Sequence, residues 1–182
     1  MKNLIASALV AIFAIATVQV QAQNVASNTK KEIKAEKREA RHNAPKNVSV
    51  KSKNSFLSDF GNVGNVTWVA TPQFDEATFT KDGTTLIAYY DYQSQLVGTT
   101  SNKKIADLPA KALKEIQKQY KDYVIGAVVE FKDNEKNDTN MMLYGTQFDD
   151  EDHYFVTISK GKHEDVLKIS LDGNVSFFRT LS

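Results

Sequence analysis

The stretch VTWVATPQFDEATFTKDGTTLIAYYDYQSQLVGTT, residues 66–100, decides the fold class of this chain. β-Branched and aromatic residues recur along it at alternate positions, which is typical of strands that bury one face. The Lys-Asp-Gly sequence at 81–83 predicts a tight turn, so that Leu86 to Asp91 returns beside the strand that contains Ala77 and Phe79. The stretch therefore predicts an antiparallel sheet rich in aromatic side chains.

A helix is predicted on either side of these strands. The first begins at the N-cap Ser55 and ends at Gly61. The second follows Asp107, with Pro109 in its first turn and apolar residues at helical spacing from Ala112 to Tyr120. Beyond it, five more strands are predicted, over 123–131, 141–148, 154–159, 166–171 and 174–180. A helix followed by antiparallel strands thus occurs twice, which predicts an α+β fold with one sheet and both helices on one face.

The N-terminus has the features of a secretory signal. Lys2 precedes an apolar run from Leu4 to Val20, and Val20-Gln21-Ala22 places small residues at the positions that a signal peptidase reads. We predict a signal peptide over 1–22, with cleavage after Ala22. A retained membrane anchor is the alternative, because the run is long enough to cross a bilayer.

Residues 23–53 form a basic segment that we predict to be a disordered linker. They contain nine Lys or Arg and three Glu, whereas 54–182 contain thirteen basic and nineteen acidic residues. The segment has too few large apolar residues to form a core. Its charge would allow a weak electrostatic association with an acidic surface such as lipid headgroups.

Residues 54–182 are predicted to form a single domain. They also carry a resemblance to a known family, in the aromatic positions and in one Leu-Pro pair. These residues are Phe60, Trp68, Ala77, Phe79, Tyr90, Asp91, Leu108, Pro109 and Tyr120. In this order behind a signal peptide they resemble the β-lactamase-inhibitor-like, PepSY-like domains of secreted Bacteroidetes proteins. The resemblance implies tandem α+β repeats with an antiparallel sheet, and the inhibitor for which the fold is named docks another protein on its sheet.

The chain departs from this family at two places. Ser94 stands where relatives have the glycine of an Asp-x-x-Gly turn, and the charged segment before Asn54 is longer than the fold requires. The first departure leaves the geometry of one hairpin open. Because the inhibitor's contact residues form no transferable motif, the resemblance assigns no binding residue here, and fold similarity does not imply β-lactamase binding.

The sequence contains no recognisable catalytic or metal-binding motif. The chain has no cysteine, and the domain has only His153 and His163, which are predicted to lie at opposite ends of one hairpin. The acidic run 133–138 lacks the glycine and the closing glutamate of a calcium loop. We therefore predict no catalytic residue, no metal and no cofactor, and the acidic domain argues against nucleic-acid binding.

An exposed sheet face is the remaining candidate site. Alternation along 86–91 puts an aromatic residue on each face, so helices that cover one face would leave large side chains exposed on the other. The candidate binding residues are Tyr89, Tyr92, Phe155 and Phe178. Loops that cover this face, or a register shifted by one residue, are the alternatives.

These observations favour a non-enzymatic binding module of the periplasm or cell exterior, soluble after signal cleavage, that recognises a protein or peptide. Two other functions stay open. One is a glycan or peptidoglycan hydrolase that uses paired carboxylates. The other is an envelope-associated structural or stress protein held by its basic segment.

Overall fold

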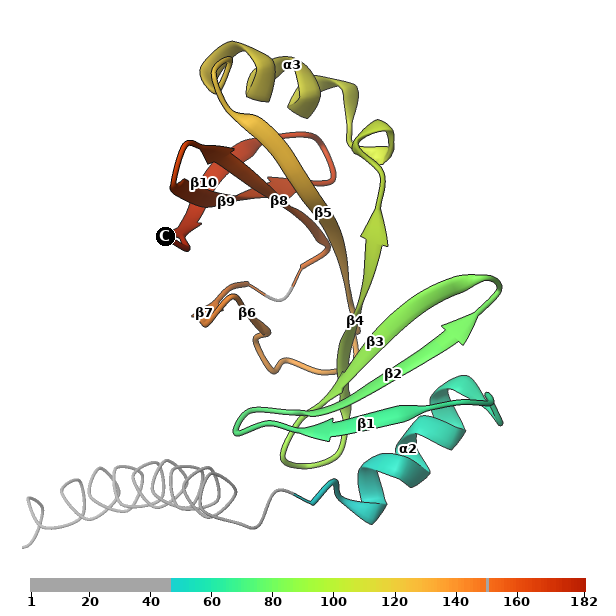
Figure 1. Ribbon diagram of the computed structural model, residues 1–182. Helices are drawn as coiled ribbons and strands as arrows, with labels where there is room; N and C mark the ends of the chain where they lie inside the picture. The colour runs from blue at the N-terminus through green and yellow to red at the C-terminus, as the bar shows by residue number, and fades with distance from the viewer. Residues whose placement is uncertain (1–46, 150) are drawn as a thin grey trace, which may run out of the picture. The chain divides into compact units, whose positions relative to one another are not determined.

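The computed structural model describes residues 47–149 and 151–182 (Figure 1). The predicted signal peptide and most of the predicted linker lie outside the described residues. The described residues contain no helix that is both long and apolar enough to cross a membrane.

The first half of the domain consists of one helix and four strands. Helix α2 (Val50–Phe60) is followed by β1 (Thr67–Ala70), β2 (Asp75–Lys81), β3 (Thr84–Tyr90) and β4 (Leu96–Lys103). The predicted N-cap at Ser55 is wrong, because Ser49 caps the helix by accepting a hydrogen bond from Lys51 N. The helix begins inside the predicted linker because polar residues of that segment cap the helix and bond it to the sheet. Ser52, for example, is fully buried and donates to Asp75.

The second half repeats this plan. A short 3-10 helix, η1 (Ile105–Asp107), leads into α3 (Ala110–Gln119), whose N-cap is Pro109. The strands that follow are β5 (Val124–Asp133), β6 (Met142–Leu143), β7 (Thr146–Gln147), β8 (His153–Lys160), β9 (His163–Ser170) and β10 (Val175–Thr180). The predicted strand over 141–148 is wrong. Tyr144 and Gly145 adopt positive φ and divide this stretch into two short strands, β6 and β7, which pair as a hairpin.

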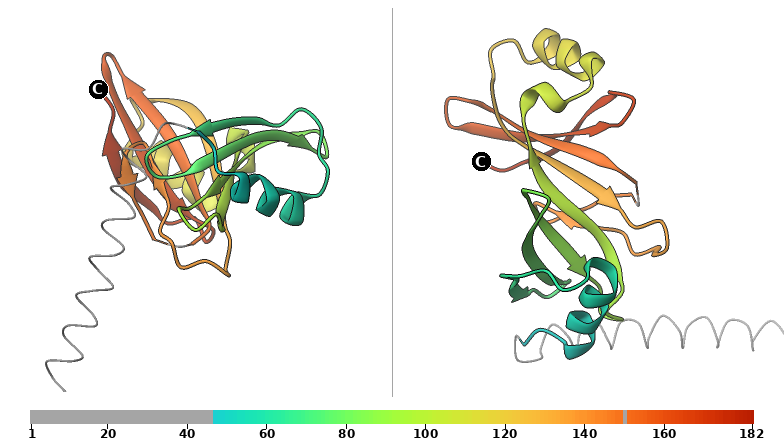
Figure 2. Two further views of the ribbon diagram at one scale, coloured as in Figure 1. Left: turned by 90° about the horizontal axis from the view of Figure 1, so that it is seen from below. Right: turned by 90° about the vertical axis from the view of Figure 1, so that its right-hand side faces the viewer.

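Eight strands form one antiparallel sheet in the order β1-β2-β3-β4-β5-β8-β9-β10. The predicted α+β class is confirmed. Figure 1 shows α2 against the β1–β3 part and α3 against the part that contains β5 and β8–β10, and the views of Figure 2 show how strongly the sheet twists between them.

The register places both helices on the same face of the sheet. Under α2, Phe56 packs with Ala77, Phe79, Ala88 and Tyr90. Under α3, the core contains Ala112, Ile116, Val128, Val156, Leu167 and Ile169. The pairs Ala77–Ala88, Ser101–Glu130 and Val156–Leu167 follow this face across the sheet. We call it the helix face.

Ser94 preserves the turn in which relatives have glycine. Its φ is 64°, and its hydroxyl contacts that of Ser52 at 2.9 Å. Asp91 closes the turn by accepting hydrogen bonds from the amides of Gln93 and Gln95. Ser94 therefore adopts the left-handed backbone that glycine favours, and its hydroxyl links the turn to α2.

Candidate functional site

The opposite face of the sheet is partly covered by residues 134–149, which we call the cover segment. It connects β5 to β8 and contains the β6–β7 hairpin (Figure 1). Met141 and Phe148 are buried against the sheet, and Met142, Leu143 and Tyr144 pack beside them. Arg179 on β10 holds the hairpin by donating to the carbonyl oxygen of Tyr144 at 2.6 Å.

Two of the four candidate binding residues lie beneath this segment. Tyr89 is 6% exposed and Phe155 is 0% exposed. The prediction that their side chains are exposed is wrong, although the face on which alternation put Tyr89 is correct. The physical reason is the cover segment, whose Phe148 ring centroid lies 4.8 Å from that of Phe155.

Burial also determines the chemistry of Tyr89. Its hydroxyl lies 3.0 Å from the Thr100 hydroxyl inside the core, and burial raises its pKa to about 12. Burial thus favours the neutral form that a phenol already has at physiological pH, and Tyr89 serves as a hydrogen-bonding core residue.

The other two candidates are half-exposed. Tyr92 lies in the turn after β3, where Gln93 Nε2 donates to its hydroxyl at 3.3 Å. Phe178 lies at a register shift in β10, and its ring packs 5.0 Å from that of Phe155. The four residues do not form one continuous surface.

The uncovered part of this face lies on β1–β3. Thr67 on β1 pairs with Thr78 on β2, and two residues further along β2, Thr80 pairs with Thr85 on β3. Three of these four side chains are exposed and Thr78 is half-buried. We call Thr67, Thr78, Thr80 and Thr85 the threonine patch. It is uncharged, and each residue offers a hydroxyl and a methyl group on a rigid strand.

Sequence analysis missed the threonine patch, although the signal was present. Thr78 and Thr80 alternate with Ala77 and Phe79, and alternation alone puts them on the face opposite the helix.

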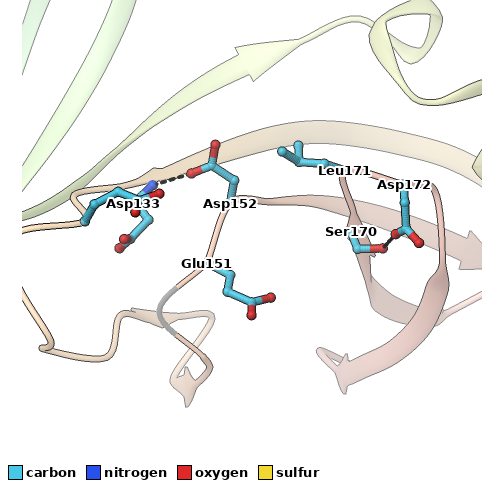
Figure 3. Close-up of a pocket in the computed structure, with 7 residues that line it drawn as sticks. Asp133, Glu151, Asp152, Ser170, Leu171 and Asp172 are labelled. Atoms are coloured by element: carbon cyan, nitrogen blue, oxygen red, sulfur yellow. Dashed lines mark hydrogen bonds between the residues drawn. The ribbon is translucent and has the colours of Figure 1, made fainter.

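A hollow of about 520 Å³ lies at the end of the sheet where β5 ends and β8 begins (Figure 3). Its lining includes Asp133, Glu135, Glu151, Asp152 and Asp172. Asp152 accepts a hydrogen bond from the Asp133 amide at 2.7 Å, and Ser170 donates to Asp172. These bonds hold part of the acidic lining in place.

The acidic side chains of the hollow can be compared with the requirements of a metal site and of a hydrolase. Within the described residues, no three side chains of metal-binding type come together. A hydrolase would need one carboxyl with a raised pKa to act as general acid. The hydrogen bond from Ser170 instead lowers the pKa of Asp172, which favours its charged form.

The two histidines of the domain lie at opposite ends of the β8–β9 hairpin, as predicted. His153 pairs with Ser170, whereas His163 pairs with Lys160 at the other end. His153 is buried between aromatic rings, with Nδ1 2.8 Å from the Glu151 carbonyl oxygen. His163 is exposed, and its Nε2 lies 2.9 Å from the Asp165 carboxylate.

One buried acid lies between the two helices on the helix face. Glu130 is 8% exposed and forms an ion pair of 3.1 Å with Lys103. Its hydrogen bond with Tyr154 contributes to the raised pKa of that phenol, of which burial is the largest cause. These contacts satisfy the carboxylate, so the group is a structural ion pair.

Comparison with solved structures reveals the same fold in Bacteroides proteins. A DUF2874 family protein from Bacteroides uniformis superposes with a TM-score of 0.59 at 11% identity, over 73% of this chain and 89% of that one. A BLIP-like protein from Bacteroides fragilis gives a TM-score of 0.55 at 18% identity, over 76% and 86%. A Bacteroides eggerthii protein predicted to be periplasmic gives 0.57 at 11% identity, over 74% and 88%.

The fold is that of the BLIP-like proteins. The fold that the family resemblance implied is thereby confirmed. Identities of 11% and 18% establish the fold and nothing about activity. No protein-family model matches the sequence, and no curated protein matches it.

Proposed function

We propose that this protein is a non-enzymatic binding module of the periplasm or cell exterior. It recognises a protein or peptide through the uncovered part of its sheet face. The threonine patch carries this proposal, because it is an exposed and uncharged surface on a paired, rigid scaffold. Such a surface docks a partner with little loss of side-chain freedom and without removing water from a charge.

The N-terminal sequence supports the proposed location. A signal peptide over 1–22 would export the chain, and a fold shared with a Bacteroides protein predicted to be periplasmic agrees with export. The basic segment 23–53 would add weak, salt-sensitive attraction to an acidic surface without inserting into it.

The experiment is capture from an envelope extract by the immobilised protein and two variants. Thr80→Arg with Thr85→Arg places two large charges on the threonine patch, and both wild-type side chains are exposed. Lys114→Glu is the control, because it changes an exposed charge on the solvent side of α3.

We expect one protein to be captured by the wild type and by the Lys114→Glu control, and to be lost from the double arginine variant. Thermal melting of all three proteins shows whether each is folded. Equal capture by all three, or capture that only the α3 variant loses, would contradict binding through the threonine patch.

A further inference from the structure

The two edges of the eight-stranded sheet differ in how they are protected. Edge strand β10 has a register shift between Phe177 and Arg179, and it carries the arginine. Beyond its end, Leu181 N donates to the Glu164 carbonyl oxygen at 2.7 Å. An irregularity and a charge are two of the devices that stop an edge strand from pairing with another chain.

Edge strand β1 has neither device. It pairs with β2 in uninterrupted register over its four residues, and no strand of the described residues lies on its other side. Residues 61–74, which contain β1 and its flanking turns, include no charged residue, although 25% of the chain is charged. Pairing along this edge would therefore bury no charge.

The outward-pointing backbone groups of β1 follow from one hydrogen bond. Thr71 N donates to the Phe74 carbonyl oxygen at 2.8 Å, so Thr71 points toward β2. Backbone direction alternates along an antiparallel strand, so Val69 also points inward, whereas Trp68 and Ala70 point outward. Each of these two offers an amide and a carbonyl at the open edge.

Exposed apolar side chains flank the same edge. Val69 is 52% exposed on the face opposite α2. On α2, Val50 and Leu57 are 73% and 53% exposed, and they lie two turns apart on one side of the helix. The other side of α2 faces β3. There the Ser52 hydroxyl donates to Ser94 in the turn after β3, and Asp59 accepts a hydrogen bond from the hydroxyl of Tyr90 on β3. Val50 and Leu57 therefore lie on the flank nearest β1.

We propose that β1 is a self-association edge, at which two copies of the chain pair antiparallel about a two-fold axis at Val69. Side chains that face each other across an antiparallel pair lie on the same face of the sheet. A two-fold axis at Val69 meets this condition. It also places the outward-pointing amide and carbonyl groups of Trp68 opposite those of Ala70 of the second copy. The arrangement makes two backbone hydrogen bonds on each side of the axis.

The sequence of β1 is self-complementary in this register. Trp68 would lie against Ala70 of the second copy, so a large side chain meets a small one on the helix face. Val69 would meet its own counterpart on the opposite face, in a favourable pair of β-branched residues. The α2 flanks of the two copies would approach over the paired Trp68 and Ala70 side chains.

This geometry favours a closed dimer over open head-to-tail assembly of many copies. Head-to-tail growth of the sheet would require β1 to pair with β10 of the next molecule, and β10 carries a bulge and a charge. Pairing of β1 with itself uses the same patch on both copies and closes after two. The association does not depend on the partner binding proposed above, since it uses the β1 edge and leaves Thr78, Thr80 and Thr85, on β2 and β3, uncovered.

The test is sedimentation of protein expressed from the complete sequence, measured over a wide range of concentration. We expect the mass to rise from one copy to two, with a blue shift in the emission of Trp68, the only tryptophan of the chain. Val69→Lys and Val69→Glu should each stay at one copy, because like charges then meet at the axis. An equimolar mixture of the two variants should recover two copies.

Two further variants separate the edge from general effects. Ala70→Pro removes an outward amide without removing a bond of the β1–β2 ladder, and it should abolish the dimer. Phe177→Lys places a charge at a 60% exposed position of the other edge and should behave as wild type. The proposal is overturned if the wild type stays a single copy at every concentration, which would leave the edge to a strand of another protein. It is also overturned if Val69→Lys still dimerises or the mixture stays monomeric.

Discussion

The face of the sheet opposite the helices has two parts, one buried by the cover segment and one exposed. At the Tyr89 end of β3, and over β4, β5 and β8, the cover segment buries Tyr89, Phe131 and Phe155 under Met141 and Phe148. Over β1–β3 the same face carries threonines that remain exposed. Residue type follows coverage, because aromatic side chains occupy the covered part and small hydroxylated ones occupy the open part.

The difference shows what makes a sheet face available for docking in this protein. In both parts the strands alternate correctly, so strand pattern alone does not separate core from surface. A connection between two strands, residues 134–149, closes one part of the face into a second core. Only the remainder can meet a partner without rearrangement.

The largest effect that sharpens this contrast is expected at Phe155, in the covered part. Its side chain is 0% exposed and packs on Phe148 and Phe178. Phe155→Ala should lower the free energy of unfolding by about 3–5 kcal/mol, because it leaves a cavity in a packed core. Urea denaturation measures the change. Phe177→Ala, at an exposed position of β10, is the control and should change stability by less than about 0.5 kcal/mol.

The two candidate tyrosines should respond very differently. Tyr89→Ser removes a buried ring and its bond to Thr100, and should cost about 3 kcal/mol. Tyr92→Ser acts on a half-exposed turn and should cost less than about 0.5 kcal/mol. Thermal melting of the two single variants distinguishes them. Equal losses would mean that the cover segment does not bury Tyr89 in solution.

Gly98 tests how tightly the covered part is packed. A Cβ atom at this position would meet the Phe131 ring and the Lys132 carbonyl oxygen at 2.5 Å. Gly98→Ala should therefore destabilise the protein by about 1–3 kcal/mol through overpacking. Gly64→Ala is the matched control, because no atom lies within 4 Å of the added Cβ there. A Gly98→Ala variant as stable as that control would mean that Phe131 moves freely.

A small effect of opposite sign is expected at Glu76, which pairs with Tyr89 and Val69 at the border of the two parts. Burial raises its pKa, so the folded protein favours the protonated form and ionisation at neutral pH is destabilising. Glu76→Gln should be more stable than wild type at pH 7, by less than about 1 kcal/mol because the residue is half-exposed. The advantage should vanish as the pH falls below the usual glutamate pKa, where both states of the wild type are protonated. Denaturation at several pH values measures it, and a constant difference would point to another cause.

Most of the sheet could be predicted from local pattern. The Lys-Asp-Gly turn at 81–83 and the alternation around Ala88 and Tyr90 are short-range signals, and both agree with the structure. The spacing of Ala112 and Ile116 likewise identified the buried side of α3.

The start of α2 and the course of the cover segment could not be predicted in this way. The position of Ser52 depends on Asp75 and Ser94, which are distant in sequence. The cover segment depends equally on distant partners, since Asn137 donates to the Leu96 carbonyl oxygen and Arg179 holds the β6–β7 hairpin. An apolar stretch such as 141–148 predicts a strand locally, and only tertiary contacts convert it into a cover.

The most direct test of docking through the open part is site-specific photo-crosslinking in cells. A photoreactive residue at Thr80 or Thr85 should crosslink to one and the same protein, because both side chains project from the threonine patch. The same residue at Lys114, on the solvent side of α3, should give no such adduct. An adduct from Lys114 with none from Thr80 and Thr85 would contradict the account and move the docking surface to the helix face.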